Sequence, residues 1–115
     1  MSFEFESVTP DFAVAAQLLP AQLASVAAAG FRSVVNNRPD AEGGAEQPSN
    51  AALEQAALAA GLQYAYLPVI PNAFKPHEVA QMADLLAVLP KPVLGFCRSG
   101  ARAANLYRAA TDAPG

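Results

Sequence analysis

The chain has 115 residues and a mass of 11.9 kDa, which suits one domain, because a single core typically needs about 100 to 150 residues. Hydrophobic residues make up 53% of it and charged residues 15%, which excludes a disordered tail and a zinc- or disulfide-stapled mini-domain. The net charge of −3 argues against a general electrostatic attraction to nucleic acid or an anionic membrane. Any anion that the chain binds must therefore be held locally.

Strand and helix signals alternate along the chain. Pro20 and Pro76 suit first helical positions, and Gly30 and Gly61 suit positions just beyond a helix end. The first two strands flank a turn at residues 8–11 and are expected to pair as a hairpin. In chain order, the sequence predicts strands at residues 3–5 and 12–18, a helix at 20–29, a strand at 31–36, a helix at 50–60, a strand at 64–70, a helix at 76–89, a strand at 93–96 and a helix at 103–110.

This order predicts the fold class. Strand-helix-strand units with short connections give a mostly parallel sheet covered by helices on both faces, a three-layer α/β domain over residues 1–115. Ligands of such sheets bind beyond the carboxyl ends of the strands. Three loops are predicted at that edge, at residues 37–48, 71–75 and 97–102, and we expect the site there.

The segment after the last strand has the parts of a nucleophilic site. Cys97 follows a strand directly, and Gly100 permits a tight loop whose N–H groups converge on one point. Such donors, with the positive end of the next helix, bind an oxyanion and stabilise a thiolate. Arg102 offers a bidentate partner for the anion. The predicted catalytic residues are Cys97 and Arg102, and the predicted oxyanion-binding residues are Arg98, Ser99, Gly100 and Ala101.

The run at residues 92–102, PVLGFCRSGAR, resembles the cysteine loop of tyrosine and dual-specificity phosphatases and also that of rhodaneses. Phosphatases place five residues between Cys and Arg, whereas four lie between Cys97 and Arg102, a spacing common in rhodanese-type loops. Across almost the whole chain, the order of segments and the runs FRSVVNNRPD (31–40) and CRSG (97–100) resemble the bacterial beta-lactamase-hydrolase-like, phosphatase-like family. This resemblance implies a dual-specificity-phosphatase-like fold and cysteine chemistry at phosphate or sulfane sulfur. Its members occur alone or fused to persulfide dioxygenase domains.

Three positions depart from the phosphatase pattern. Phe96 stands where a His usually precedes the Cys, and Ala103 stands where a hydroxyl usually follows the Arg. The loop that usually carries a general-acid Asp reads Pro-Asn-Ala at residues 71–73. Because a general acid typically contributes about 10²- to 10⁴-fold, we expect alkyl phosphates to be poor substrates.

Polar residues elsewhere could complete the site. Asp40 and His77 are the candidate acids, although the sequence favours a solvated turn for Asp40 and a surface or capping role for His77. Arg38 and Arg98 could widen the anion site or serve only as solubilising charge. The carboxylates Glu42 and Glu46 are expected on a solvated loop face.

The sequence thus predicts a cysteine-dependent hydrolase that acts on phosphomonoesters through a cysteinyl phosphate. Two alternatives remain open: a rhodanese-like sulfurtransferase that uses a Cys97 persulfide, and a non-catalytic module that binds an anion or a partner. The expected partner is a small anionic substrate, without nucleic acid, membrane, cofactor or metal. A single cysteine and an acidic N-terminus without a signal-peptide pattern predict a cytoplasmic protein.

Overall fold

The computed structural model describes residues 2–112. Within these residues, five strands and four α-helices follow one another, with a short 3₁₀ helix (Pro20–Gln22) before the first α-helix. The elements are β1 (Glu6–Thr9), β2 (Phe12–Ala15), α1 (Leu23–Ala28), β3 (Ser33–Asn36), α2 (Asn50–Ala59), β4 (Gln63–Tyr66), α3 (Pro76–Val88), β5 (Val93–Phe96) and α4 (Ala101–Thr111).

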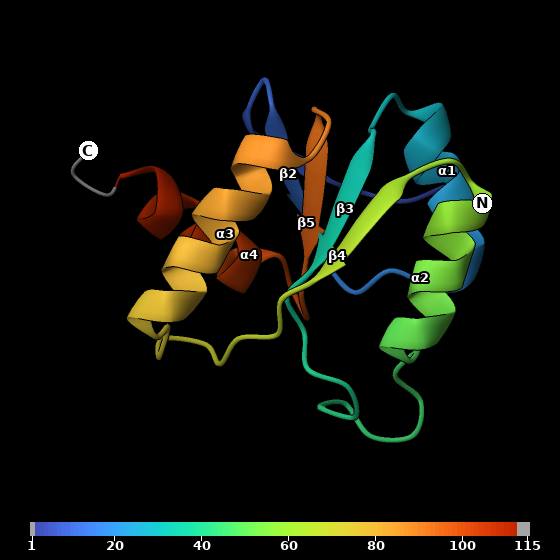
Figure 1. Ribbon diagram of the computed structural model, residues 1–115. Helices are drawn as coiled ribbons and strands as arrows, with labels where there is room; N and C mark the ends of the chain where they lie inside the picture. The colour runs from blue at the N-terminus through green and yellow to red at the C-terminus, as the bar shows by residue number, and fades with distance from the viewer. Residues whose placement is uncertain (1, 113–115) are drawn as a thin grey trace.

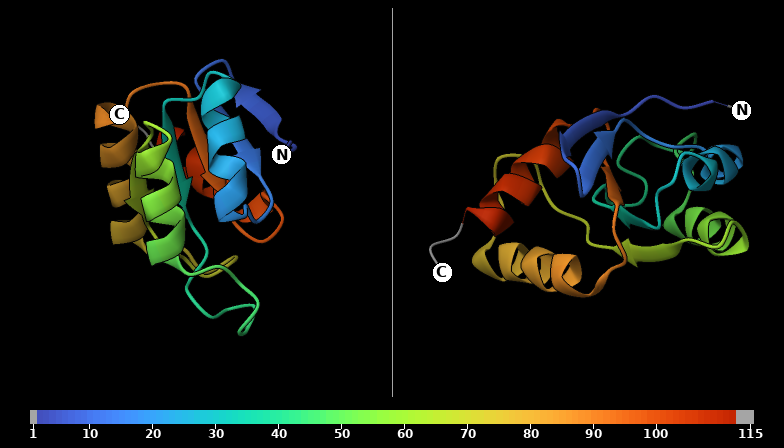
Figure 2. Two further views of the ribbon diagram at one scale, coloured as in Figure 1. Left: turned by 90° about the vertical axis from the view of Figure 1, so that its right-hand side faces the viewer. Right: turned by 90° about the horizontal axis from the view of Figure 1, so that it is seen from above.

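The strands form one sheet in the order β1-β2-β5-β3-β4. The pairs β2–β5, β5–β3 and β3–β4 are parallel, and only the edge strand β1 is antiparallel to its neighbour β2. Helices α1 and α2 cover one face, and α3 and α4 cover the other (Figures 1 and 2). The predicted three-layer α/β fold with a mostly parallel sheet is confirmed.

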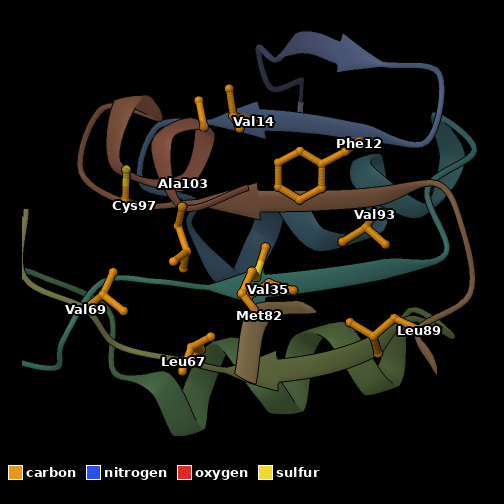
Figure 3. Close-up of a cluster of buried hydrophobic side chains, with 12 residues drawn as sticks. Phe12, Val14, Val35, Leu67, Val69, Met82, Leu89, Val93, Cys97 and Ala103 are labelled. Carbon is orange, nitrogen blue, oxygen red and sulfur yellow. The ribbon is translucent and has the colours of Figure 1, made fainter. Parts of the chain in front are cut away.

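Each face of the sheet has its own hydrophobic core. On the α1 and α2 side, Leu23, Val26 and Leu53 pack against the sheet, and none of the three is more than 1% exposed. On the other side, Met82 is fully buried with Val35 and Val93 (Figure 3), and Leu106 belongs to the same cluster. Strands that are buried on both faces are typical of parallel sheets between helical layers, so these cores hold the central strands in place.

Proline, serine and glycine set the helix boundaries. Pro76 is the first residue of α3, as predicted, and the Ser49 hydroxyl caps α2 by accepting a hydrogen bond from the Ala52 N–H at 3.2 Å. Gly30 and Gly61 follow α1 and α2 with φ of 103° and 84°, in the left-handed region that glycine adopts without steric cost.

Several predicted boundaries are wrong: the strand predicted at 12–18 ends at Ala15, the strand predicted at 31–36 begins at Ser33, and the predicted helix at 20–29 starts with a 3₁₀ turn. The predicted strand at residues 3–5 is not a strand: the turn lies at Pro10 and Asp11, so the pairing with β2 extends back only to Glu6. The rings of Phe3 and Phe5 instead stack on each other, 5.4 Å between centroids. The predicted strand at 64–70 ends at Tyr66, although the Leu67 and Val69 N–H groups still donate to the Asn36 and Asn37 carbonyls at 2.9 and 3.2 Å.

A further difference concerns the last helix. It begins at Ala101 rather than at residue 103, with Gly100 as its N-cap in a left-handed conformation (φ 96°). Arg102 therefore lies in the first turn of α4 instead of in a loop, and its backbone is fixed by the helix.

The loops that follow β3, β4 and β5 meet at the carboxyl edge of the sheet. The loop between β3 and α2 extends beyond the end of the strands (Figure 1). Side-chain hydrogen bonds join Arg102 to Glu42 in this loop and to the Val69 carbonyl in the loop after β4. The predicted convergence of three loops at one edge is thus observed.

Two leucines of α2 test this core. Leu53 is 1% exposed beneath the helix and Leu58 is 58% exposed on its outer face. We expect Leu53→Ala to lower the free energy of unfolding by about 2 to 5 kcal/mol, because it leaves a cavity, and the matched control Leu58→Ala to change it by less than about 0.5 kcal/mol. Urea unfolding followed by circular dichroism measures both; equal effects would contradict the described packing.

Candidate active site

Cys97 lies immediately after the central strand β5, at the edge of the core. Cys97 is 1% exposed. It belongs to one of the two hydrophobic clusters and lies at the end of that cluster, where β5 ends (Figure 3). The Cys97 N–H donates to the Ala15 carbonyl of β2 at 3.4 Å, and the Asn37 N–H donates to the Phe96 carbonyl at 2.9 Å. Both neighbouring strands therefore fix the backbone that carries the sulfur.

The loop after Cys97 turns its backbone donors inward. The Gly100 N–H donates to the Cys97 Sγ at 3.1 Å. The Ala101 N–H donates to the Ser99 hydroxyl at 3.4 Å. The N–H groups of Arg98 and Ser99 donate to no group of residues 2–112 and are available to an anion.

Arg102 is held in a fixed orientation beside this loop. Its side chain is 7% exposed, and its Nη1 and Nη2 donate to the two carboxylate oxygens of Glu42 at 3.0 and 2.9 Å. Nη1 also donates to the Val69 carbonyl at 3.2 Å. The buried Nε has no hydrogen-bond partner within the described chain. One edge of the guanidinium is thus occupied by protein, and the Nε–H and the second Nη2–H remain as possible donors to an anion.

Glu42 has a role that the sequence does not predict. It lies on an exposed loop, as the sequence predicts, and its carboxylate also bridges Arg102 and Arg38, with Arg38 Nε at 3.0 Å from Oε1. The hydrogen bonds from Arg102, with a smaller effect from Arg38, lower the pKa of Glu42 below its ordinary value, against the opposing effect of burial. No local signal marks this contact, because Glu42 and Arg102 are sixty residues apart in sequence.

A polar network holds the loop that carries Glu42. The Asp40 carboxylate accepts from the Asn50 N–H at the start of α2 at 2.7 Å, and the Asp40 N–H donates to the Tyr66 hydroxyl at 2.9 Å. The Tyr64 hydroxyl donates to Asn50 Oδ1 at 2.6 Å, and burial raises the pKa of Tyr64, which keeps this hydroxyl protonated. Asp40, one of the two candidate acids, thus anchors the loop to α2.

A pocket of about 240 Å³ opens over the cysteine loop. Its lining residues are Pro71, Asn72, Cys97, Arg98, Ser99, Ala101, Arg102 and Asn105. The structure brings Cys97 and Arg102 together here, as predicted, and adds Asn72 and Asn105, which the sequence did not single out. None of these described residues carries a carboxylate or an imidazole, and neither Asp40 nor His77 lines the pocket.

Two further properties of the described chain bear on the site. No group of three or more His, Cys, Asp or Glu side chains in residues 2–112 is arranged to hold a metal ion. Within the same residues, no helix combines the length and apolar character needed to cross a membrane.

A buried cysteine at the carboxyl end of a central parallel strand, followed by a loop and a helix-borne arginine, defines a cysteine-phosphatase-like α/β domain. Residues 4–113 match the family model described as "Beta-lactamase hydrolase-like protein, phosphatase-like domain", and the chain belongs to this family. The resemblance inferred from the sequence is confirmed.

Individual relatives agree with this assignment. A beta-lactamase hydrolase-like protein of Agrobacterium fabrum is 35% identical over 94 residues, which cover 82% of this chain but only 22% of that protein. The chain thus spans about a fifth of the length of this curated relative. A crystal structure of a candidate phosphatase from Neisseria meningitidis superposes with a TM-score of 0.83 at 27% identity, over 96% of this chain and 79% of the other.

More distant structures share the fold. A C132S variant of TpbA from P. aeruginosa, solved in complex with pTyr, superposes with a TM-score of 0.67 at 19% identity, over 96% of this chain and 65% of that one. At this identity the likeness concerns the fold alone.

The ion pair of Glu42 predicts a pH-dependent stability. Because the folded-state pKa is lowered, the carboxylate stabilises the fold above its ordinary value of 4.5, and this contribution is lost as the pH falls through the folded-state value. We expect Glu42→Gln to lower the free energy of unfolding by about 1 kcal/mol or more at pH 7, because it leaves the buried Arg102 charge unpaired. The difference from the wild type is expected to shrink below pH 4.5.

The matched control is Glu46→Gln in the same loop, since Glu46 forms no ion pair within residues 2–112. Urea unfolding of the three proteins between pH 3 and 8 makes the comparison. A Glu42→Gln effect that is independent of pH, or equal to that of Glu46→Gln, would contradict the bridge.

Proposed function

We propose that this domain hydrolyses phosphate monoesters through a cysteinyl-phosphate intermediate. The observation that carries the proposal is the buried guanidinium of Arg102, whose Nη1 and Nη2 are held by Glu42 while its Nε has no partner in the described chain, next to Cys97 in one pocket. A fixed, partly unsatisfied cation beside a nucleophile is the arrangement that stabilises charge on a transferring phosphoryl group.

The reaction has two steps in this proposal. The Cys97 thiolate sulfur bonds to phosphorus as the ester P–O bond breaks, and the leaving oxygen keeps the bonding electron pair. Water then attacks phosphorus, breaks the S–P bond, regenerates the thiolate and releases inorganic phosphate. Arg102 and the N–H groups of Arg98 and Ser99 hold the phosphoryl oxygens in both steps, while the Gly100 N–H donates to the Cys97 sulfur.

The composition of the pocket limits the substrate. With no carboxylic acid or imidazole among the described lining residues, the leaving oxygen departs without a proton from the protein. Glu42 does not replace the missing acid, because its ion pair with Arg102 lowers its pKa. Aryl phosphates, whose phenoxide leaves unassisted, are therefore the favoured substrate class.

One observation favours sulfur transfer as the second candidate function. Four residues separate Cys97 from Arg102, as in rhodanese-type loops, and transfer of sulfane sulfur from thiosulfate needs no acid for the leaving group. In that reaction the Cys97 thiolate attacks the outer sulfur, the S–S bond breaks and sulfite leaves with the electron pair. The resulting persulfide then passes its outer sulfur to a thiophilic acceptor such as cyanide.

The dependence of the rate on the leaving group tests whether phosphate esters are hydrolysed without a general acid. We expect p-nitrophenyl phosphate to be turned over at least about 10²-fold faster than an alkyl phosphate, because the protein provides no proton donor. Across a series of aryl phosphates, log kcat/KM is expected to fall steeply as the pKa of the leaving phenol rises. Steady-state assays with wild type and Cys97→Ser, which removes the nucleophile, measure the enzymatic rate and its background.

A flat dependence on the phenol pKa would show that an acid takes part and would contradict the substrate argument. Turnover of thiosulfate with cyanide, but of no phosphate ester, would replace the hydrolase proposal with sulfur transfer. Turnover of neither substrate class, with anion binding intact, would make the domain a binding module.

A further inference from the structure

A second cavity lies beside the Cys97 pocket. It has a volume of about 560 Å³ and is lined by Arg38, Glu42, Gly43, Pro71, Arg98 and Arg102. Pro71, Arg98 and Arg102 also line the Cys97 pocket, so the two cavities adjoin along a shared wall. A group bound at Cys97 therefore has the second cavity as its immediate neighbour.

The second cavity has an excess of positive charge. It contains three guanidinium groups and a single carboxylate, in a chain whose net charge is −3. Glu42 is shared between Arg38 and Arg102, and the exposed side chain of Arg98 forms no hydrogen bond or ion pair within residues 2–112. One carboxylate cannot neutralise three cations, so the cavity favours an anion.

Arg38 is built into the wall of this cavity. It is 9% exposed, with Nε bound to Glu42 at 3.0 Å and Nη1 bound to the Gln17 side-chain oxygen at 3.1 Å. Its Nη2 has no hydrogen-bond partner in the described chain. Gly43 leaves room for it, because a Cβ at this position would lie 2.7 Å from Nη2. A buried guanidinium with a free donor is organised to bind an anion without further ordering.

We propose that this second cavity binds another anionic group of the substrate, a phosphate or a carboxylate, next to the phosphoryl group held at Cys97. Arg98, which lines both cavities, and Arg38 are the residues that recognise it. The inference rests on the proposed phosphatase function and narrows its substrate to phosphate esters that carry a second anion close to the scissile group.

Binding of non-hydrolysable ligands tests the second cavity without turnover. The probes are phenylphosphonate, 1,3-phenylenediphosphonate and 3-phosphonobenzoate, titrated by calorimetry at one fixed ionic strength because screening changes charge–charge attraction. Two of these ligands, the diphosphonate and the phosphonobenzoate, carry a second anionic group. We expect at least one of them to bind about tenfold or more tightly than phenylphosphonate, the gain typical of one charge-assisted hydrogen bond. Comparison of 1,3-phenylenediphosphonate with 3-phosphonobenzoate shows whether the second cavity prefers a phosphate-like group or a carboxylate.

Two variants locate the effect. The affinity ratio is the affinity for a ligand with a second anion divided by the affinity for phenylphosphonate. Arg98→Gln and Arg38→Gln are each expected to reduce this ratio at least about threefold. Arg32→Gln is the matched control, because it removes the same charge from an exposed position next to the amino end of β3, at the opposite edge of the sheet. It is expected to leave the ratio unchanged.

Equal affinity for all three ligands, or no binding of any of them, would overturn the proposal. An equal loss in Arg32→Gln would also overturn it, since the preference would then be a general charge effect. Folding of each variant is checked by circular dichroism. If Arg98→Gln unfolds, Arg98→Lys replaces it; this variant keeps the charge and is expected to retain part of the preference for ligands with a second anion. A preserved preference in a protein that turns over no aryl phosphate would refute the phosphatase function and leave the second anion site standing.

Discussion

The arrangement of the site depends on one ion pair, in which the Glu42 carboxylate holds the buried guanidinium of Arg102 at 3.0 and 2.9 Å. A buried arginine without a partner would be strongly destabilising, so the bridge makes this side chain tolerable in the fold. It also decides which donors remain free. Glu42 and Val69 engage both Nη1 hydrogens and one Nη2 hydrogen, so the Nε–H and the second Nη2–H are the donors left for an anion.

The bridge also links elements that are far apart in the sequence. Glu42 comes from the loop after β3, which Asp40 and Tyr66 anchor to α2 and β4. Arg102 comes from the first turn of α4, and the Val69 carbonyl from the loop after β4 completes its contacts. A displacement of any one of these loops would therefore change the orientation of the cation beside the cysteine.

Much of the fold could be predicted because it depends on local signals. Pro76 at a helix start, Gly61 after a helix end and the apolar run before Cys97 each specify a boundary through backbone chemistry that is visible in the sequence. Phe3 was predicted in a strand because aromatic residues favour strands, but the position of the turn decides which residues pair. The role of Glu42 could not be predicted, since a carboxylate in a polar, Gly-rich loop is ordinarily solvated and its partner is brought to it only by the tertiary fold.

The central claim is that Cys97 accepts the transferred group as a nucleophile held beside Arg102. Rapid acid quenching of the wild-type protein with excess p-nitrophenyl phosphate, followed by mass spectrometry of the Cys97 peptide, tests this claim most directly. The account predicts a phosphoryl group on the Cys97 sulfur, formed within the first turnover and absent from Cys97→Ser. Steady release of nitrophenol by the wild type, with Cys97 unmodified at every quench time and Cys97→Ser equally active, would contradict it.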